Sequence, residues 1–336
     1  MRKGIQKSRF GKLADGTEIE IYTLTNANGL SCKITNYGAI LTEVHTPDSA
    51  GKFANIILGF GDLKGYLEDK SYLGATIGRV TNRIAKARFT LNGKTYNLAA
   101  NDGPNHLHGG IRGFNQQVWR AEPNPDRVEL RLGYTSPDME EGYPGKVRVE
   151  VSYELTDANE LRLTYKATTD QPTLVNMTNH AYWNLAGHGD ILRHELTVAA
   201  DEHTPLDSQN LPSGKIASVQ GTPFDFRTPT AIGSRFNQFD KTPAGYDANY
   251  VLKREKGAMV FVARARDPES GRVLELWTDQ PGMQLYTAHY LPRPCTGFCL
   301  ETQNYPDAIN QPNFPTPILK PGETYLHRTT HRFSAA

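Results

Sequence analysis

Cysteine, unbalanced charge and long hydrophobic runs are all scarce in this sequence, and each absence excludes a class of protein. Only three cysteines, Cys32, Cys295 and Cys299, occur among 336 residues, which argues against a disulfide-stabilised secreted scaffold. The N-terminal stretch has no apolar core of the kind that a signal peptide carries. No apolar run approaches the roughly 18 residues of a membrane-spanning helix. We therefore expect a cytoplasmic protein with no membrane segment.

Neither sign of charge dominates. Lys and Arg together number 37 and Asp and Glu number 36, so the formal net charge is +1. Such a balance offers no electrostatic reason to expect nucleic acid, an anionic membrane or an acidic substrate as a partner. The sequence does not decide the oligomeric state, so a monomer and a homodimer both remain open.

A helical hydrophobic period is also missing, because no stretch of about twelve residues or more repeats its apolar positions every 3.6 residues. Instead, alternating stretches rich in β-branched and aromatic residues recur, and Gly, Pro, Asn or Asp bound each of them. These stretches cover residues 18–24, 127–134, 146–155, 160–169, 258–267 and 272–279.

Strands that run without alternating helices favour antiparallel sheets packed face to face. We therefore predict an all-β fold, a large antiparallel β-sandwich with few short helical turns, for example after Asp62 and near Pro229. The stretch ELTDANEL between two alternating segments predicts a hairpin connection. No linker, low-complexity segment or repeat interrupts the chain, so we expect one domain over residues 1–336.

The stretch LVNMTNHAYWNLAG at 174–187 predicts a strand with a row of uncharged polar residues on one face. Read with a period of two, one face carries Val175, Met177, Ala181, Trp183 and Leu185, and the other carries Asn176, Thr178, His180, Tyr182 and Asn184. Each polar group that stays unpaired when buried costs about 1–3 kcal/mol. The row is therefore expected to pair with another strand or to face a hydroxyl-rich ligand.

Two glycine-containing stretches carry further polar candidates. The stretch at 73–85, LGATIGRVTNRIA, lacks the GK[ST] ending of a phosphate-binding loop, so only Asn82 and Arg83 stand out. A turn asparagine and a surface arginine are the ordinary explanation.

The stretch at 101–110, NDGPNHLHGG, holds His106 and His108, but no third metal ligand is close in sequence. We predict no metal, and these histidines are either loop residues or hydrogen-bond donors in a cleft.

A glutamate in the middle of a predicted strand is a strong candidate for chemistry. In GFCLETQNYPDAINQP at 297–312, Phe298 and Leu300 share one face, whereas Cys299, Glu301 and Gln303 share the other. Burial of a carboxylate is costly unless it is hydrogen-bonded or used.

Two single residues belong with this glutamate. Gln284 lies in another alternating stretch, GMQLYTAHYL, and Asp247 lies beside a glycine in AGYDANY. An aspartate at a glycine turn is more often structural than functional.

Seven motifs make the chain recognisable when they are taken in order. They are GRVTNRIA, LHGG, EGYPG, NMTNHAYWNLAG, GYDANY, QPGMQLYT and GFCLETQNYPDAINQP. Together they closely resemble the aldose 1-epimerases, the galactose mutarotases, over nearly the whole chain. The resemblance implies a galactose mutarotase-like supersandwich with an open cleft. It also implies interconversion of the α and β anomers of a free hexose such as galactose or glucose, with no metal or organic cofactor.

The resemblance implies residue roles, motif by motif. Glu301 in CLETQN matches the general base of the family, and His180 in TNHAYWN matches its general acid. The substrate-binding positions of the family are matched by Asn82, Arg83, His108, Asp247 and Gln284.

The chain departs from the family pattern at Ala181, Trp183 and Ala248, and the loop YLPRPCTG before the catalytic motif is shorter than in some relatives. None of these positions is the expected acid or base, but Trp183 and the loop are candidates to reshape the rim of a sugar site. The sequence therefore does not specify galactose, glucose, xylose or arabinose. Cys295 and Cys299 are expected to be structural.

Opening a sugar ring requires that the C1 hydroxyl lose a proton while the ring oxygen gains one. We expect Glu301 to take the first proton and His180 to supply the second, with rotation about C1–C2 before the ring closes. Three alternatives stay open at this point: a glycoside hydrolase or lyase that uses Asp247 as a second carboxylate, a non-catalytic sugar-binding module, and a phosphosugar epimerase.

Overall fold

β-strands dominate the computed structural model, which describes residues 2–240 and 242–336. The described residues form strands β1 to β27, one short α-helix and five short 3₁₀ helices. In the largest sheet every neighbouring pair of strands is antiparallel. The prediction of an all-β fold with antiparallel sheets and few short helices is confirmed.

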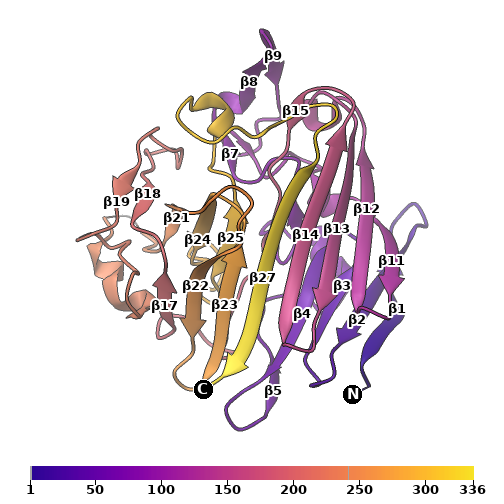
Figure 1. The fold of residues 1–336 in the computed structure, drawn as a ribbon, viewed down its shortest axis with the longest axis vertical. Coiled ribbons are helices and arrows are strands. Elements are labelled where there is room, and N and C mark those ends of the chain that lie inside the picture. The colour runs from indigo at the N-terminus through magenta and orange to yellow at the C-terminus, as the bar shows by residue number, and fades with distance from the viewer. Residues whose placement is uncertain (1, 241) are drawn as a thin grey trace.

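The largest sheet has nine strands and forms the front layer in Figure 1. Its order is β11 (Arg120–Asn124), β12 (Glu129–Ser136), β13 (Val147–Leu155), β14 (Glu160–Thr169), β27 (Tyr325–Ala335), β23 (Arg272–Thr278), β22 (Val260–Arg266), β17 (Glu195–Val198) and β20 (Thr230–Ala231). Its long strands alternate buried and solvent-facing residues, for example along β13. One face of the sheet therefore packs inward and the other is open to solvent.

A five-stranded N-terminal sheet lies behind β12–β14 in Figure 1. It consists of β1 (Gly4–Lys12), β2 (Glu18–Thr25), β3 (Ser31–Thr35), β4 (Ile40–Pro47) and β5 (Phe53–Asn55), in that order. A second five-stranded sheet consists of β19 (Ala217–Ser218), β18 (Glu202–Thr204), β21 (Asp247–Val251), β24 (Gly282–Tyr286) and β25 (Cys299–Gln303).

The three large sheets share one hydrophobic core. Leu24 of the N-terminal sheet, Val151 of the nine-stranded sheet and Leu285 of the second five-stranded sheet are all fully buried in the same cluster. Because a shared core couples the sheets, we propose that residues 1–336 fold as one domain.

Short strand pairs and helical turns connect these sheets. The pairs are β6 (Thr76–Ile77) with β16 (Thr178–Asn179), β7 (Arg83–Ile84) with β10 (His106–Leu107), β8 (Arg88–Leu91) with β9 (Lys94–Asn97), and β15 (Thr173–Leu174) with β26 (Ile318–Leu319). The helical pieces are α1 (Leu63–Glu68), η1 (Ala85–Ala87), η2 (Phe114–Gln116), η3 (Glu140–Gly142), η4 (Ile232–Gln238) and η5 (Ala308–Asn310).

Local sequence signals agree with the observed elements. The six alternating stretches correspond to β2, β12, β13, β14, β22 and β23. The predicted hairpin joins β13 to β14 and contains Asn159 with a positive φ of 59°, a conformation that asparagine tolerates. The helical turn expected after Asp62 is α1, whose first turn is capped because the Asp62 carboxylate accepts a hydrogen bond from the Gly65 N–H at 2.9 Å. The turn expected near Pro229 is η4.

The stretch 174–187 is not the single strand that its alternation predicts. Within it only Leu174, the last residue of β15, and Thr178–Asn179 of β16 form ladders, and isolated bridges at Asn176 and Trp183 join other parts of it to distant segments. A row of residues that alternate in polarity can also arise from an irregular buried segment, provided that side chains satisfy its backbone groups.

Asparagine side chains do this in the present chain. Asn176 is bonded in both directions to the backbone of Asn304, and the amide of Asn184 donates to the backbone carbonyls of His188 and Thr296. Of the predicted polar row, only His180 and Tyr182 line a cavity. Most of the row therefore pairs with other segments and holds the chain in place.

Trp183, a candidate to reshape a sugar rim, and Ala248, where the chain also departs from the family pattern, both lie in the interior. Trp183 is 1% exposed, and its ring packs against Phe333 of β27 at 5.8 Å between centroids. Ala248 is 2% exposed and belongs to the same core cluster. Among the described residues, no helix has the length and apolar character that crossing a membrane would need.

Candidate active site

Three neighbouring strands bring polar side chains together in two rows. One row consists of Asp247, Tyr286 and Cys299, and the next consists of Asn249, Gln284 and Glu301. Residues opposite each other on antiparallel strands point to the same face, as do residues two apart on one strand. The other face of these strands carries apolar residues of the core, among them Ala248, Leu285 and Leu300. The alternation of β21, β24 and β25 thus builds a polar floor on a hydrophobic support.

A short strand pair supplies the opposite wall. Asn82 precedes β7 and His108 follows β10, and the two backbones are joined by a hydrogen bond from the His108 N–H to the Asn82 carbonyl at 3.0 Å. The Asn82 N–H in turn donates to Nδ1 of His108 at 3.2 Å. Both residues have positive φ values, 60° and 51°, which are uncommon outside glycine and often mark functional positions. This clamp fixes the ring of His108.

His180 lies between the floor and this wall. Its backbone N–H donates to the carbonyl of Ala75 at 2.9 Å, directly after the β16–β6 ladder. Its Nε2 lies 3.6 Å from Oε1 of Glu301, and its ring stands edge-on to that of His108 with centroids 5.1 Å apart. The two histidines and the glutamate, which come from three distant parts of the sequence, therefore meet.

These residues line a cavity of about 360 Å³, a size that suits a small-molecule ligand. The residues around it are Lys70, Ser71, Tyr72, Asn82, Arg83, Leu107, His108, His180, Tyr182, Asp247, Tyr286, Tyr290, Leu291 and Glu301. Six of the seven residues predicted from the sequence are among them, and Gln284 is not.

Gln284 lies behind the cavity and contacts a residue that lines it. Its Nε2 donates to Oδ1 of Asp247 at 2.5 Å, and its Oε1 accepts from Gln303 at 3.3 Å. Gln284 is thus placed to orient Asp247.

Arg83 is held between two carboxylates. Its Nε donates to Oδ2 of Asp102 at 2.7 Å, and its Nη1 lies 3.9 Å from Oδ2 of Asp247. The Arg83 side chain is only 14% exposed, so these pairs offset the cost of removing a guanidinium from water. The second carboxylate, Asp102, fixes the direction in which Arg83 points into the cavity.

Burial dominates the electrostatics of Glu301. Desolvation raises the pKa of its carboxyl group well above the usual value, the negative charge of Asp247 adds to this rise, and Arg83 opposes it. Oε2 of Glu301 is buried and has no hydrogen-bond partner among the described residues. A buried polar atom without a partner is unusual in a native structure, and here it belongs to a residue that lines a cavity.

Burial lowers the pKa of the two histidines, whereas it raises the pKa of Glu301. It lowers the pKa of His180 to about 4. It lowers the pKa of His108 well below the usual value, and the nearby His180 and Arg83 strengthen this effect. Because Nδ1 of His108 accepts a hydrogen bond from a backbone N–H, the neutral ring carries its proton on Nε2 and can donate into the cavity.

His106 and His108, the two histidines singled out in the sequence, do not point toward a common position. The ring of His106 is turned away, with Nδ1 against the carbonyl of Ala99 at 2.8 Å and Nε2 against the hydroxyl of Tyr143 at 2.7 Å. His106 therefore belongs to the structural support of the wall, whereas His108 belongs to the cavity.

A different set of potential ligands does converge. Side-chain atoms of His108, His180 and Glu301 lie within 4.8 Å of one another, and two imidazoles with a carboxylate are a common Zn²⁺ donor set. A metal-bound histidine coordinates through a lone pair and usually donates its other N–H to a second group. His108 has the reverse arrangement, since its Nδ1 is the acceptor and its proton is on Nε2. The site fits a hydrogen-bond donor better than a metal ligand.

Several cavity residues were not anticipated from the sequence. Tyr286 had a usable signal, because it lies two residues after Gln284 on an alternating strand and so shares its face. The loop that contributes Lys70, Ser71 and Tyr72 had none, since it is irregular. Its shape depends on tertiary contacts, such as the hydrogen bond that the hydroxyl of Tyr182 donates to the carbonyl of Ser71 at 2.8 Å.

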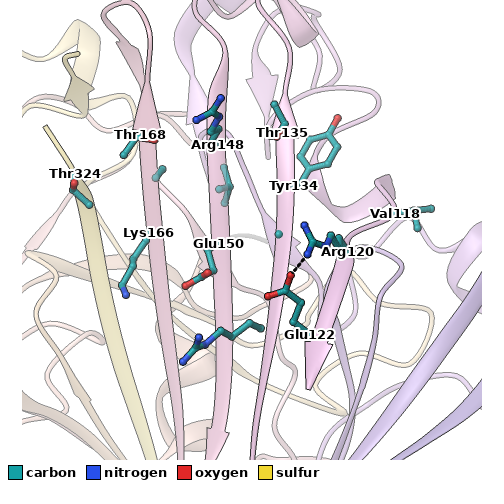
Figure 2. Close-up of a pocket in the computed structure, with 14 residues that line it drawn as sticks. Val118, Arg120, Glu122, Tyr134, Thr135, Arg148, Glu150, Lys166, Thr168 and Thr324 are labelled. Atoms are coloured by element: carbon teal, nitrogen blue, oxygen red, sulfur yellow. Dashed lines mark ion pairs between the residues drawn. The ribbon is translucent and has the colours of Figure 1, made fainter. Parts of the chain in front are cut away.

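A larger hollow of about 750 Å³ lies on the solvent face of the nine-stranded sheet, over β11–β14. Figure 2 shows side chains of both charges along it, with Arg120 and Glu122 joined as an ion pair. It contains no histidine and none of the seven residues predicted from the sequence. A buried carboxyl group next to a histidine is therefore found at the smaller cavity and not here.

Removing the carboxylate that holds Arg83 is expected to weaken ligand binding. In an Asp102→Asn variant, the charged hydrogen bond to Arg83 is lost, so KM for the substrate should rise about 3- to 30-fold while kcat changes less. Steady-state kinetics measures this split. Asp170→Asn is the matched control, since Asp170 forms a surface ion pair with Lys146 at 3.6 Å, and it should leave KM unchanged. An equal KM in both variants would contradict the role of Asp102.

Known proteins resemble this chain in sequence and in fold. The sequence model of the family described as Aldose 1-epimerase matches residues 20–332. A galactose mutarotase from Sus scrofa is 45% identical over 99% of both chains. An aldose 1-epimerase from Escherichia coli (strain K12) is 36% identical, over 96% of this chain and 97% of that protein.

A solved structure extends the likeness to three dimensions. The crystal structure of galactose 1-epimerase from Lactobacillus acidophilus superimposes with a TM-score of 0.87 at 27% identity, and the match covers 100% of both chains. A family match over nearly the whole chain, relatives above 30% identity and a shared fold agree with one another. The chain belongs to the aldose 1-epimerase family.

Proposed function

We propose that Glu301 and His180 are the general base and the general acid of an aldose 1-epimerase, acting on a free aldose held in the 360 Å³ cavity. The members of this family are isomerases that interconvert the α and β anomers of aldoses such as galactose. The observation that carries the proposal is the unpartnered Oε2 of the buried Glu301, next to the imidazole of His180.

Glu301 and His180 share one proton, which either the carboxylate or the imidazole can hold. Burial disfavours both the carboxylate and the imidazolium, so it favours a pair made of a neutral carboxylic acid and a neutral imidazole. Transfer of one proton across the 3.6 Å between Oε1 and Nε2 gives the carboxylate and the imidazolium. The reacting form therefore needs no proton from solvent.

In the reacting form, Glu301 removes the proton of the C1 hydroxyl while His180 protonates the ring oxygen. The C1–O5 bond breaks and a carbonyl forms at C1. Rotation about C1–C2 then presents the other face of the carbonyl, and both proton transfers run in reverse when the ring closes. Each positioned proton transfer contributes about 10²–10⁴-fold to the rate, which is sufficient for a reaction that already proceeds in water.

The remaining cavity residues orient the sugar. The Nε2–H of His108 is placed to donate to an oxygen of the ring or of C1. Arg83, Asn82 and Asp247 offer donors and acceptors for hydroxyl groups, and Gln284 orients Asp247. Fixed geometry of this kind lowers the entropic cost of bringing acid, base and substrate together.

A His180→Asn variant tests the acid. Asparagine retains a hydrogen-bonding side chain but cannot deliver a proton, so kcat should fall about 100-fold or more while KM stays within a few-fold. Polarimetry on freshly dissolved α-galactose measures the rate. His188→Asn is the control, because His188 is exposed outside the cavity, and it should behave as the parent. A parental rate in His180→Asn would remove His180 from the role of acid.

Two other enzyme classes are separated by a change of substrate. A glycoside hydrolase would use Glu301 with Asp247 as its carboxylate pair, and it would release monosaccharide from a disaccharide. A phosphosugar epimerase would act on glucose 6-phosphate in preference to glucose. We expect no monosaccharide release and faster mutarotation of the free sugar. A binding module would retain the sugar without accelerating mutarotation.

We also propose a cell compartment and an assembly state for this protein. Cys32, Cys295 and Cys299 are free thiols, which supports a reducing compartment such as the cytoplasm. We propose a monomer or a homodimer that acts on a small free sugar, with neither nucleic acid nor membrane as a partner.

A further inference from the structure

The two nitrogens of the His180 ring are both contacted by one strand. Glu301 of β25 lies 3.6 Å from Nε2, and Cys299, two residues earlier on the same strand and face, places its Sγ 3.5 Å from Nδ1. Both side chains are fully buried, with exposed fractions of 0% for Cys299 and 2% for Glu301. The strand therefore holds the imidazole from both ends.

We propose that Cys299 is a positioning residue for His180: its sulfur holds Nδ1 in both protonation states of the ring and so keeps Nε2 directed at Glu301 and the substrate. The inference rests on the proposed function, because it assumes that His180 is the acid. It assigns to Cys299 a part in the reaction beyond the structural one expected from sequence.

A thiol can serve both protonation states because its S–H is a weak donor and its sulfur is a weak acceptor. Burial raises the pKa of Cys299 well above the usual value, so the group stays a thiol. It can donate to Nδ1 when that nitrogen has a lone pair. By rotating its hydrogen away, it can accept from Nδ1–H when the ring is an imidazolium.

The weakness of sulfur as an acceptor matches the acidity that the reaction needs. The ring oxygen of a sugar is a poor base, so the imidazolium must be a strong acid. A carboxylate against Nδ1 would stabilise the imidazolium and make it a weaker acid. With a sulfur there, burial keeps the pKa of His180 at about 4.

Other groups around the ring have to be considered in any pH measurement. Those that face His180 are Glu301 and Cys299 on β25, Tyr286 on β24, Tyr182, Tyr72 and His108. Arg83 and Asp247 act on Glu301 through their charges, and the backbone of His180 itself favours the imidazolium. Substitution of Cys299 leaves the other groups in place, so a change in the pH profile would report on the sulfur.

Two substitutions separate positioning from packing. Cys299→Ser keeps a donor and acceptor and offers a stronger acceptor than sulfur. We expect kcat within a few-fold of the parent and a basic limb of the kcat/KM profile displaced to higher pH, because the imidazolium is stabilised. Cys299→Val keeps the size but leaves Nδ1–H without a partner. We expect kcat about 10-fold lower and a basic limb displaced to lower pH.

A control variant and an NMR measurement separate the contact of Cys299 with His180 from general effects on packing. Cys32→Val replaces a fully buried thiol in the main core and should change thermal stability without moving either limb of the profile. The ¹⁵N shift of His180 Nδ1, measured by NMR in the parent and in Cys299→Ser, should differ between the two. The difference in chemical shift tests the contact between Cys299 and His180 even if Cys299→Val does not fold.

The possible outcomes distinguish this inference from the proposed function. Parental rates and pH profiles in both Cys299 variants, together with an inactive His180→Asn, would overturn the role of Cys299 and leave the acid assignment standing. An equal loss in both Cys299 variants with no shift of the profile would mean that the sulfur only fills space. A fully active His180→Asn would overturn both.

Discussion

A Glu301→Gln variant should lose about 10²–10⁴-fold in kcat for mutarotation, because the amide cannot accept the proton of the C1 hydroxyl. The same substitution should leave the fold intact or stabilise it at neutral pH. A carboxyl group whose folded pKa is raised, as burial does here, contributes stability only at low pH and loses it as the pH rises through the folded pKa. Activity and stability are therefore expected to change in opposite directions.

Polarimetry and thermal unfolding at pH 7.5 measure these two effects. Glu150→Gln is a matched control, since Glu150 lies in the middle of β13 on the solvent face of the nine-stranded sheet, and it should alter neither quantity by much. A Glu301→Gln variant that retains the parental rate would exclude Glu301 as the base. A large drop in melting temperature would instead show that the ionised carboxylate supports the fold.

Mild acid should destabilise the protein strongly, between about pH 6.5 and pH 4. Burial lowers the pKa of four histidines to about 4, namely His180, His194, His327 and His331. In the unfolded chain each of these histidines takes up a proton near pH 6.5. The unfolded state therefore binds more protons in this window, and the free energy of unfolding decreases as the pH is lowered. Below pH 4 the folded state is protonated as well, and the effect stops growing.

The expected size is large relative to the stability of a protein. A depression of this size is worth on the order of 3 kcal/mol for each histidine, whereas whole proteins are stable by about 5–15 kcal/mol. Urea unfolding at pH 7.5 and at pH 4.5 measures the difference. An equal free energy of unfolding at the two pH values would contradict the prediction.

A single substitution can test the origin of this acid sensitivity. His331 is buried, its ring lies 5.0 Å from that of Trp183, and its Nδ1 has no hydrogen-bond partner among the described residues. His331→Phe keeps an aromatic ring there and removes the titrating group, so the loss of stability between pH 6.5 and pH 4 should become smaller. His188→Phe, at an exposed position, should leave the slope unchanged.

Regular strands could be predicted from the sequence because their alternation reflects a simple physical situation. In β13 and β14 one face meets the core and the other meets water, so polarity follows the strand period. Glu301 could be found for the opposite reason: a carboxylate on a buried strand has to be explained by use or by pairing. Both arguments depend on local sequence alone.

The conformation of the segment around His180 could not be predicted from local sequence. Its polarity alternates, but its backbone is satisfied by contacts with residues far along the chain, such as Asn304 with Asn176. Tertiary hydrogen bonds of this kind leave no mark on neighbouring residues. The same reason explains why neither Asp102 as the partner of Arg83 nor Asp247 as the partner of Gln284 was anticipated from the sequence.

The position of β27 has a consequence for how the protein is made. This strand includes the C-terminal residues 325–335, yet it lies in the middle of the nine-stranded sheet, between β14 and β23 (Figure 1). Until it emerges from the ribosome, β14 and β23 each present an open edge that invites pairing with another chain. During synthesis these two edges therefore stay open until β27 is available, and the nine-stranded sheet becomes continuous only when that strand pairs.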